Sequence, residues 1–352
     1  MITMSRSICF APLLFTLGCA SSPPPAAPSP SPAAKSAGPG MVAVLGVLPA
    51  DDPAPEVAAA PPAPPPPPPP PVVAYSLAVR DLIDPPASPL LDAVSADVRR
   101  GDWAKASVSL AKLLPGIDEK GQIHEKIAAH ALAGRIAARM KNAKKADTEY
   151  EKALELSKEP SAEPEGNDAE NRHRHQTLAF AVGEAQFYFA EKKGKEADDV
   201  AMPKYHGSGS REDVLAFINQ KIVTWIKTKR PKTEEAEKQY AKILAHQPSP
   251  HPHWAIAASA RVGQLWARFV DDFRNAPMPK EWMSDGVIPG TELTYAELRT
   301  EYRSKLEEAS EAQFESARRA FGSCVDYATK FNIANEDSKR CQAWLAAHPS
   351  AK

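Results

Sequence analysis

The chain has 352 residues and a formal net charge of -1. Twenty of its 36 prolines lie between Pro23 and Pro71, so we expect no packed core in the first fifth of the chain. From Pro85 onward the chain has 40 Lys and Arg residues against 39 Asp and Glu residues. This balance gives no electrostatic reason to expect nucleic acid or acidic lipid as a partner.

Residues 1–18 have the form of an export signal peptide. Arg6 supplies positive charge, and residues 8–17 supply an apolar stretch. That stretch is too short for a membrane-spanning helix, which needs about 20 residues. We therefore expect export, with no membrane span in the mature chain.

The predicted signal is followed directly by Cys19. The sequence Thr16-Leu17-Gly18-Cys19 resembles the lipobox of bacterial lipoproteins at its last two residues and departs from it at the first two. The resemblance implies cleavage before Cys19 and a lipid on its sulfur. Ala20 follows Cys19 in place of the aspartate that retains enterobacterial lipoproteins in the inner membrane. By this analogy we expect the lipid anchor in the outer membrane, with the protein facing the periplasm. Ordinary secretion after cleavage near Ala20 is the alternative.

Residues 19–85 are predicted to be a lipidated, disordered, proline-rich tether. Pro64–Pro71 is an unbroken proline run, which favours the extended polyproline II conformation. Residues 41–48, which read MVAVLGVL, interrupt the tether with an apolar segment. We expect this segment either to dock as a strand on a partner's sheet edge or to pack on its own domain.

Residues 86–352 are predicted to form an all-α domain. Apolar residues recur at three- and four-residue intervals, and no convincing run alternates with a period of two. Ser210 and Thr294 each begin a capping-box sequence, which predicts a helix start at both positions.

One spacing recurs in this domain: a small residue, a large apolar residue four positions later, and an apolar residue three positions further. It occurs at Ala106-Leu110-Leu113, Ala146-Tyr150-Ala153, Ala236-Tyr240-Ile243 and Ala317-Phe321-Cys324. Residues at this spacing share one helical face, where the small residue lets a neighbouring helix approach.

The pattern resembles the second helix of a tetratricopeptide repeat. The best copy spans residues 127–160, with Gly134 at the glycine position of the first helix and Lys141 in place of the usual glycine between the helices. A degenerate unit is expected at residues 177–200. The resemblance implies an irregular helical-repeat solenoid, and a generic helical bundle is the alternative.

The part of the chain from about Asp168 to Leu345 resembles a repeat-protein family of deltaproteobacteria, especially myxobacteria. The resemblance rests on YHGSGSREDVLAFINQKIVTWIKTKR, on PHWAIAASARVGQLWARFVDDFRNAPMPKEW and on a late pair of cysteines. Some relatives are envelope components of the adventurous gliding-motility machinery. The resemblance implies a scaffold in the periplasm.

The late pair, Cys324 and Cys341, remains after Cys9 in the signal and Cys19 at the lipobox. An even pair of cysteines in an oxidising compartment favours a disulfide. Two buried free thiols are the alternative.

Candidate chemistry is sparse. The five clustered histidines have no Cys or carboxylate at a supporting interval, so we interpret them as solvated loop residues and expect no metal or other cofactor; they are His173, His175, His246, His251 and His253. The loop YHGSGSRED fits neither the P-loop nor the dinucleotide fingerprint, and we interpret it as a turn capped by Ser210. No nucleophile signature is present, so we expect no catalytic residue.

Aromatic residues gather between residues 254 and 282. Trp266, Phe269 and Phe273 share a helical face and are expected in the core. Trp282 is expected to be an exposed anchor residue.

These observations favour an interaction scaffold that binds envelope proteins, as part of a cell-envelope or gliding-motility complex, and that meets the membrane through its lipid. We expect no small-molecule substrate. The alternative is an envelope protein that binds or cleaves peptidoglycan, which would need two carboxylates facing one cleft for cleavage.

Overall fold

The computed structural model describes residues 89–159, 169–247 and 249–349, and all contacts given below lie within these ranges. The predicted signal, Cys19, the tether and the segment 41–48 lie outside the described residues. In the described ranges the fold is all-α, as predicted, with an isolated β-bridge between Val287 and Thr294 and no strand. No helix in this part of the chain combines the length and the apolar character that crossing a membrane requires.

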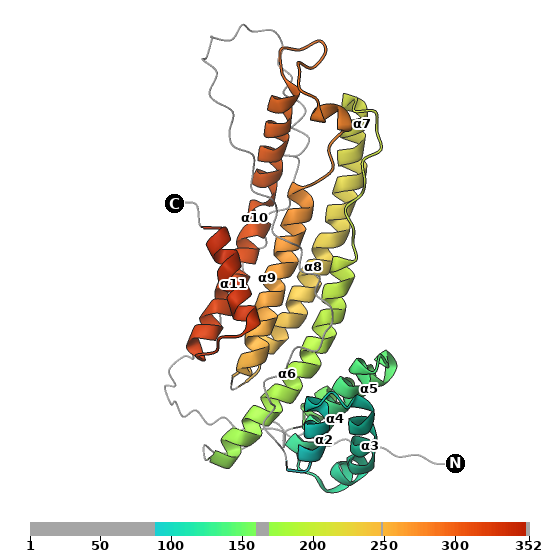
Figure 1. Cartoon of the computed structure of the whole chain (residues 1–352), viewed down its shortest axis with the longest axis vertical. Coiled ribbons are helices and arrows are strands. Elements are labelled where there is room, and N and C mark those ends of the chain that lie inside the picture. Colours follow the sequence, from blue (N-terminus) through green and yellow to red (C-terminus); the bar gives the residue numbers. More distant parts are fainter. Residues whose placement is uncertain (1–88, 160–168, 248, 350–352) are drawn as a thin grey trace, which may run out of the picture. The chain divides into compact units, whose positions relative to one another are not determined.

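Helices that follow one another along the chain pack together (Figure 1). The shorter N-terminal helices are α2 (Asp92–Arg99), α3 (Trp103–Lys120), α4 (Ile123–Arg139) and α5 (Ala143–Leu156). The longer helical stretches are α6 (Ala169–Asp198), the continuous run α7 (Arg211–Ala216), η2 (Phe217–Ile222) and α8 (Val223–Leu244), then α9 (Pro252–Arg274) and α10 (Tyr295–Lys330). The remaining elements are the 3-10 turn η3 (Lys280–Met283) and α11 (Glu336–Ala347).

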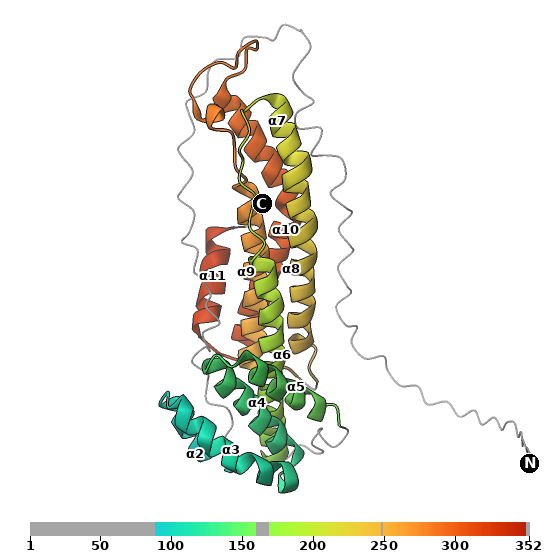
Figure 2. The same cartoon turned by 90° about the vertical axis from the view of Figure 1, so that its right-hand side faces the viewer.

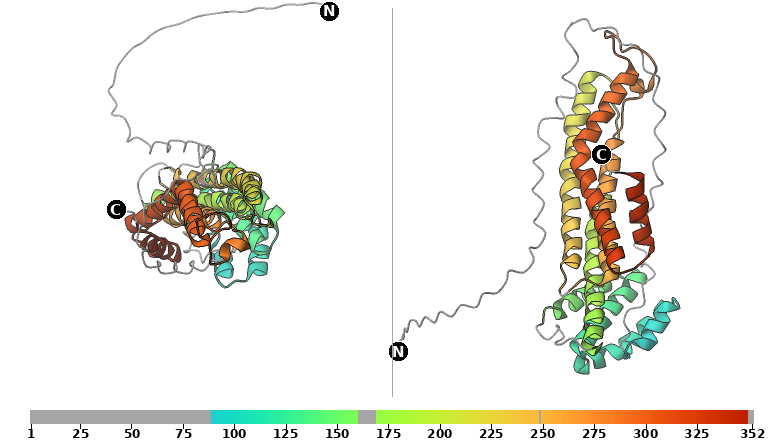
Figure 3. Two further views of the ribbon diagram at one scale, coloured as in Figure 1. Left: turned by 90° about the horizontal axis from the view of Figure 1, so that it is seen from above. Right: turned by 90° about the vertical axis from the view of Figure 1, so that its left-hand side faces the viewer.

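Figures 2 and 3 show the order of packing, in which α6 is shared between two groups of helices. On one side α6 contacts α4 and α5, and α4 in turn contacts α3. On the other side α6 contacts α8 and α9, and α9 packs along α10 with α11 against both. Most contacts therefore join helices that are near in sequence, as in stacked helix pairs.

Three of the connections between helices share one backbone geometry. The residue after the helix has a positive φ at Gly101 (79°), Lys141 (61°) and Asn332 (52°). In each case the N–H of this residue donates a hydrogen bond to the carbonyl oxygen three residues earlier in the chain. The N–H of the following residue donates to the carbonyl oxygen five residues before its own position; these donors are Asp102, Asn142 and Ile333, with N···O distances of 2.9–3.0 Å. These are the two hydrogen bonds of the Schellman motif, which ends a helix and reverses the chain.

Glycines on one helix meet aromatic rings on the next. A Cβ added to Gly134 of α4 would lie 2.8 Å from the ring of Tyr150 on α5. A Cβ on Gly263 of α9 would lie 2.7 Å from the ring of Phe321 on α10. Both rings are middle residues of sequence triplets, so these two triplets mark points where two helix backbones approach closely.

The buried side chains form three apolar clusters. One joins α2, α3 and α4, a second joins α4, α5 and α6, and the largest joins α6, α8, α9, α10 and α11. The predicted core residues Trp266, Phe269 and Phe273 belong to the largest cluster and are 3–4% exposed.

Several predictions from the sequence are wrong in detail. The degenerate unit at 177–200 is the interior of α6, which runs unbroken to Asp198 and takes α8 as its partner helix. Leu113 is 39% exposed, because α3 turns Leu110 and Leu114 towards its neighbours instead. Trp282 is 5% exposed and packs edge-on against Tyr302, so it is not a surface anchor.

The two predicted helix caps are confirmed. The Ser210 side chain accepts a hydrogen bond from the N–H of Asp213 at 3.2 Å. The Thr294 side chain and Glu297 form a complete capping box at the start of α10. Each cap satisfies backbone N–H groups that the first turn of a helix leaves without partners.

Candidate functional site

An open groove lies between α3, α4 and α5. Its volume is about 200 Å³, several times the ~30 Å³ share of one water molecule. Its floor is apolar and is formed by Leu110, Leu114, Ala133, Ile136 and Ala137. Met140, which is 49% exposed, and Ala111 stand at its edge. The groove offers an apolar surface that an extended or helical peptide could cover.

One wall of the groove is fixed by a buried histidine. His130 of α4 is 1% exposed, and its Nδ1 lies 2.7 Å from the Glu149 carboxylate on α5. Its Nε2 lies 2.9 Å from the carboxylate of Asp118 on α3, which also accepts a hydrogen bond from Lys152. Burial raises the pKa of Asp118, but the hydrogen bonds from Lys152 and His130 outweigh it and lower that pKa overall. The three helices that line the groove are thus joined by one polar chain.

The repeat-signature residues hold these helices together. Ala146 and Ala153 of α5 are fully buried, and Tyr150 between them packs over Gly134. The Tyr150 hydroxyl donates to Glu184 of α6 at 3.0 Å. Gly134, Ala146, Tyr150 and Ala153 therefore shape the packing beneath the groove and do not line it, whereas Leu110 of the first triplet is part of its floor.

Besides the Tyr150 hydroxyl, Glu184 also contacts Arg135 in a buried ion pair. Arg135 of α4 donates to both carboxylate oxygens of Glu184, and both side chains are about 5% exposed. Burial alone would lower the pKa of Arg135, but the Glu184 charge reverses the effect and raises it. Burial and then the Glu184 charge raise the pKa of Tyr150 well above its ordinary value. The Arg135–Glu184 pair ties α4 to α6, and the Tyr150 hydroxyl adds α5 to the same contact.

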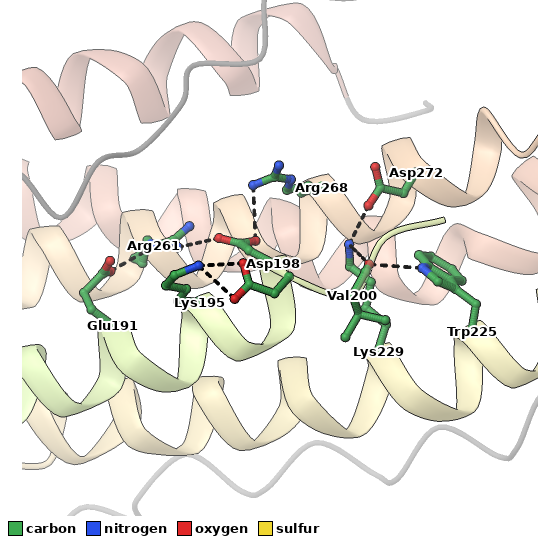
Figure 4. Close-up of polar contacts among 10 residues, drawn as sticks. Glu191, Lys195, Asp198, Val200, Trp225, Lys229, Arg261, Arg268 and Asp272 are labelled. Atoms are coloured by element: carbon green, nitrogen blue, oxygen red, sulfur yellow. Dashed lines mark hydrogen bonds and ion pairs between the residues drawn. The ribbon is translucent and has the colours of Figure 1, made fainter. Parts of the chain in front are cut away.

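A tyrosine and an arginine that share one glutamate also occur where α6 packs on α8 and α9. The repeat-signature residues of α8 and α10 are all buried; they are Ala236, Tyr240, Ala317 and Phe321. Figure 4 shows Arg261 of α9 reaching Glu191 at 2.9 Å and Asp198 at 2.7 Å, both on α6. The Tyr240 hydroxyl of α8 donates to the same Glu191. On each side of α6, a triplet tyrosine and a buried arginine therefore share one glutamate of this helix: Glu184 towards α4 and α5, and Glu191 towards α8 and α9.

A second set of contacts in Figure 4 holds the chain just after α6. The Val200 carbonyl accepts hydrogen bonds from the Trp225 indole at 3.3 Å and from the Lys229 ammonium at 3.4 Å, both on α8. Lys229 is 1% exposed and also pairs with Asp272 of α9. These contacts join three elements through one buried ammonium group, and the loss of its partners would leave that charge buried without compensation.

The predicted solvated loop histidines are not all in loops. His173 and His175 lie on α6, and His253 lies within α9 and is 3% exposed. His251 lies at the N-cap position of α9 without a side-chain cap hydrogen bond, and burial lowers its pKa to about 4. Within the described ranges no group of three or more His, Cys, Asp or Glu side chains is arranged to hold a metal ion.

The loop YHGSGSRED binds its own side chains. The Asp213 carboxylate accepts hydrogen bonds from the N–H and the hydroxyl of Ser208, at 2.8 and 2.5 Å. The N–H of Gly209 donates to the Tyr205 hydroxyl at 2.9 Å. The N–H groups of Ser208 and Gly209 are therefore already engaged, which agrees with the interpretation of this loop as a capped turn.

The sulfur atoms of Cys324 on α10 and Cys341 on α11 lie at disulfide distance, 2.20 Å apart, and both side chains are fully buried. The link joins α11 to the end of α10, so the C-terminal helix is attached covalently as well as by packing.

The groove and the buried ion pairs were not predicted from the sequence. A usable signal was present in the arginines, since Arg135 adjoins Gly134 and Arg261 lies two residues before Gly263 on otherwise apolar helix faces. A charged residue at such a position implies a buried partner.

Comparisons of this chain with protein-family models, with curated proteins and with solved structures found no match.

Proposed function

We propose that the chain is a protein-protein interaction scaffold that binds an envelope protein in the groove between α3, α4 and α5. The observation that carries the proposal is the open apolar floor of this groove on helices that are fixed from below by Tyr150, Arg135 and Glu184. A preorganised apolar surface of this kind binds a peptide without first paying the entropy of ordering its own helices.

The proposal includes the irregular tetratricopeptide-like solenoid. Support comes from the four sequence triplets, which all lie on the later helix of a packed pair: α3, α5, α8 and α10. Further support comes from the glycine-aromatic contacts of α4 with α5 and of α9 with α10. In such architectures the stacked helix pairs present binding surfaces to protein partners.

The proposed location is the periplasm, with a lipid on Cys19 in the outer membrane and the proline-rich tether between lipid and helical domain. The support is the sequence around Cys19, and a tether would raise the local concentration of partners within its reach. Mass spectrometry of the mature N-terminus tests this part, since an unmodified Cys19 or cleavage at another residue would contradict it.

Peptidoglycan cleavage has less support at this groove. Glycosidases of the common type place two carboxylates on either side of the scissile bond. Among the described residues that line the groove, Glu149 is the carboxylate, and it is engaged with His130. The groove is therefore better suited to apolar contact than to acid-base catalysis.

The binding proposal is tested with a charge placed in the groove. Ala111 is exposed and lines the groove, so Ala111→Glu puts a carboxylate against the apolar floor without disturbing the core. We expect this variant to lose the envelope proteins that the wild-type chain retains after crosslinking and isolation. Val287→Glu, at a 59% exposed residue between α9 and α10, is the matched control and should retain them. Equal retention by the two variants would contradict the proposal.

A further inference from the structure

The chemistry of the groove selects an uncharged, apolar occupant. Of the residues that line it, Lys145 and Glu149 are charged, with opposite signs, and the Glu149 carboxylate lies 2.7 Å from the ring of His130. The buried floor, which includes Leu110 and Ile136, rewards the burial of apolar side chains. A peptide with several charges would lose hydration over this apolar floor, where Lys145 is the one cation among the lining residues and Glu149 is already engaged with His130.

The chain itself carries a segment with this chemistry. Residues 36–50 contain no charged side chain, and residues 41–48 within them read MVAVLGVL. A second apolar stretch, residues 72–79, is followed at once by Arg80 and Asp81, which would be brought to the edge of an apolar floor. Beyond Leu48 the nearest charge is Asp51, three positions away, whereas Arg80 directly follows residues 72–79, which also carry the hydroxyl groups of Tyr75 and Ser76. The purely apolar side chains and the wider uncharged margin therefore favour residues 41–48.

The connection is long enough to allow this contact. Forty residues separate Leu48 from Pro89, the first described residue. At ~3.1 Å per residue they can span up to roughly 120 Å. The groove lies on α3, α4 and α5, and α3, with 18 residues at 1.5 Å each, is only about 27 Å long. Because both parts belong to one chain, binding would be intramolecular, and its effective concentration is set by the length and stiffness of the connection.

We infer that residues 41–48 occupy the groove of their own chain when no partner is bound. The inference rests on the proposed function, because it takes the groove to be the binding surface and makes the partner compete with an internal ligand. The apparent dissociation constant of a partner then equals its intrinsic value divided by the fraction of chains in which the groove is open.

The test uses the full chain, purified in detergent, with the photo-crosslinking residue p-benzoylphenylalanine in place of Leu45. Mass spectrometry identifies the peptides that become attached. We expect crosslinks within one chain to α3, α4 and α5, independent of protein concentration. A matched control carries the probe at Leu77, in the other apolar stretch and nearer to the domain along the chain. Its yield at these helices should be lower by about tenfold, the ratio that a 1.4 kcal/mol difference in free energy gives.

A second variant tests the groove itself. Ala111→Glu in the Leu45 probe chain should reduce the crosslink to α3, α4 and α5 by about tenfold or more, because the segment would then face a carboxylate. The inference is overturned if Leu45 attaches to other helices, if Leu77 attaches equally well, or if the product forms only between two chains and rises with concentration.

The outcome also separates this inference from the proposed function. If Ala111→Glu abolishes retention of envelope proteins while Leu45 gives no crosslink to the groove, the binding surface stands and the internal ligand does not exist. If Leu45 gives the expected crosslink and no envelope protein depends on Ala111, the groove serves the chain itself and the proposed function fails.

Discussion

The close contact between Gly263 of α9 and Phe321 of α10 predicts that Gly263→Ala lowers the free energy of unfolding, although the same substitution in a helix interior normally raises it. Gly263→Ala adds one methyl group in a helix interior, where alanine is normally favoured over glycine by about 0.5–1 kcal/mol. Here the new Cβ would lie 2.7 Å from Phe321 Cδ1 and 2.8 Å from Cγ and Cε1. Ordinary contact begins at 3.4 Å, so the ring or the helix must move by about 0.7 Å.

There is little room for that movement. Phe321 is 3% exposed, and its ring centroid lies 4.6 Å from that of Trp344 on α11, which is attached to α10 through the disulfide. Overpacking of a filled core costs about 1–3 kcal/mol. After the helix preference is subtracted, we expect Gly263→Ala to lower the free energy of unfolding by up to about 2.5 kcal/mol.

Gly322 is the matched control. It is the next residue after Phe321 on α10, and a Cβ added there meets nothing within 4 Å. Gly322→Ala should therefore raise the free energy of unfolding by about 0.5–1 kcal/mol through helix preference alone.

Urea denaturation followed by far-ultraviolet circular dichroism measures both variants at one pH and one temperature. A double-mutant cycle with Phe321→Leu adds a direct test, because the smaller side chain should relieve part of the cost of Gly263→Ala. The reasoning is refuted if Gly263→Ala is as stable as Gly322→Ala, since the contact would then impose no strain.

Three further predictions use the same denaturation assay. Arg135→Met removes the cation from the buried Glu184 carboxylate and should lower the free energy of unfolding by about 3–5 kcal/mol; a loss below 1 kcal/mol would show that Glu184 has another source of stabilisation. Lys141→Gly relieves a φ of 61° and should raise the free energy of unfolding by about 0.5–1 kcal/mol, net of the greater entropy of the unfolded chain; a loss of stability would contradict the helix-ending geometry. Burial lowers the pKa of His251 to about 4, from 6.5 when unfolded, so the unfolded chain takes up the proton first as the pH falls. The contribution of His251 to the free energy of unfolding should therefore have its full value above pH 6.5 and decrease by up to about 3 kcal/mol towards pH 4. His251→Gln should remove that part of the decrease, and an unchanged pH dependence would exclude His251 as its source.

The sequence carried enough information for the helical class, the caps and the close contacts between helices. A triplet such as Ala146-Tyr150-Ala153 encodes packing locally, because all three side chains share one helix face. A cap such as Ser210 is equally local, since its partner is three residues away. Features of this range can be found by spacing alone.

The remaining features depend on residues that are distant in sequence. Glu184 is 34 residues from Tyr150 and 49 from Arg135, so no spacing rule pairs them. Trp282 was expected at the surface, but Tyr302 on α10, 20 residues further along the chain, packs against it. The groove could not be predicted either, because it exists only where α3, α4 and α5 meet.

Crosslinking from Met140 in whole envelopes tests the central claim, binding at the groove, most directly. Met140 lines the groove and is 49% exposed, so p-benzoylphenylalanine there can reach a bound partner without altering the core. The account predicts that the probe at Met140 gives a discrete adduct with another envelope protein. The adduct should be absent when the probe is placed at Val287 instead, and it should be lost when Ala111→Glu is added to the chain with the Met140 probe. No adduct from Met140, or the same adduct from Val287, would contradict it.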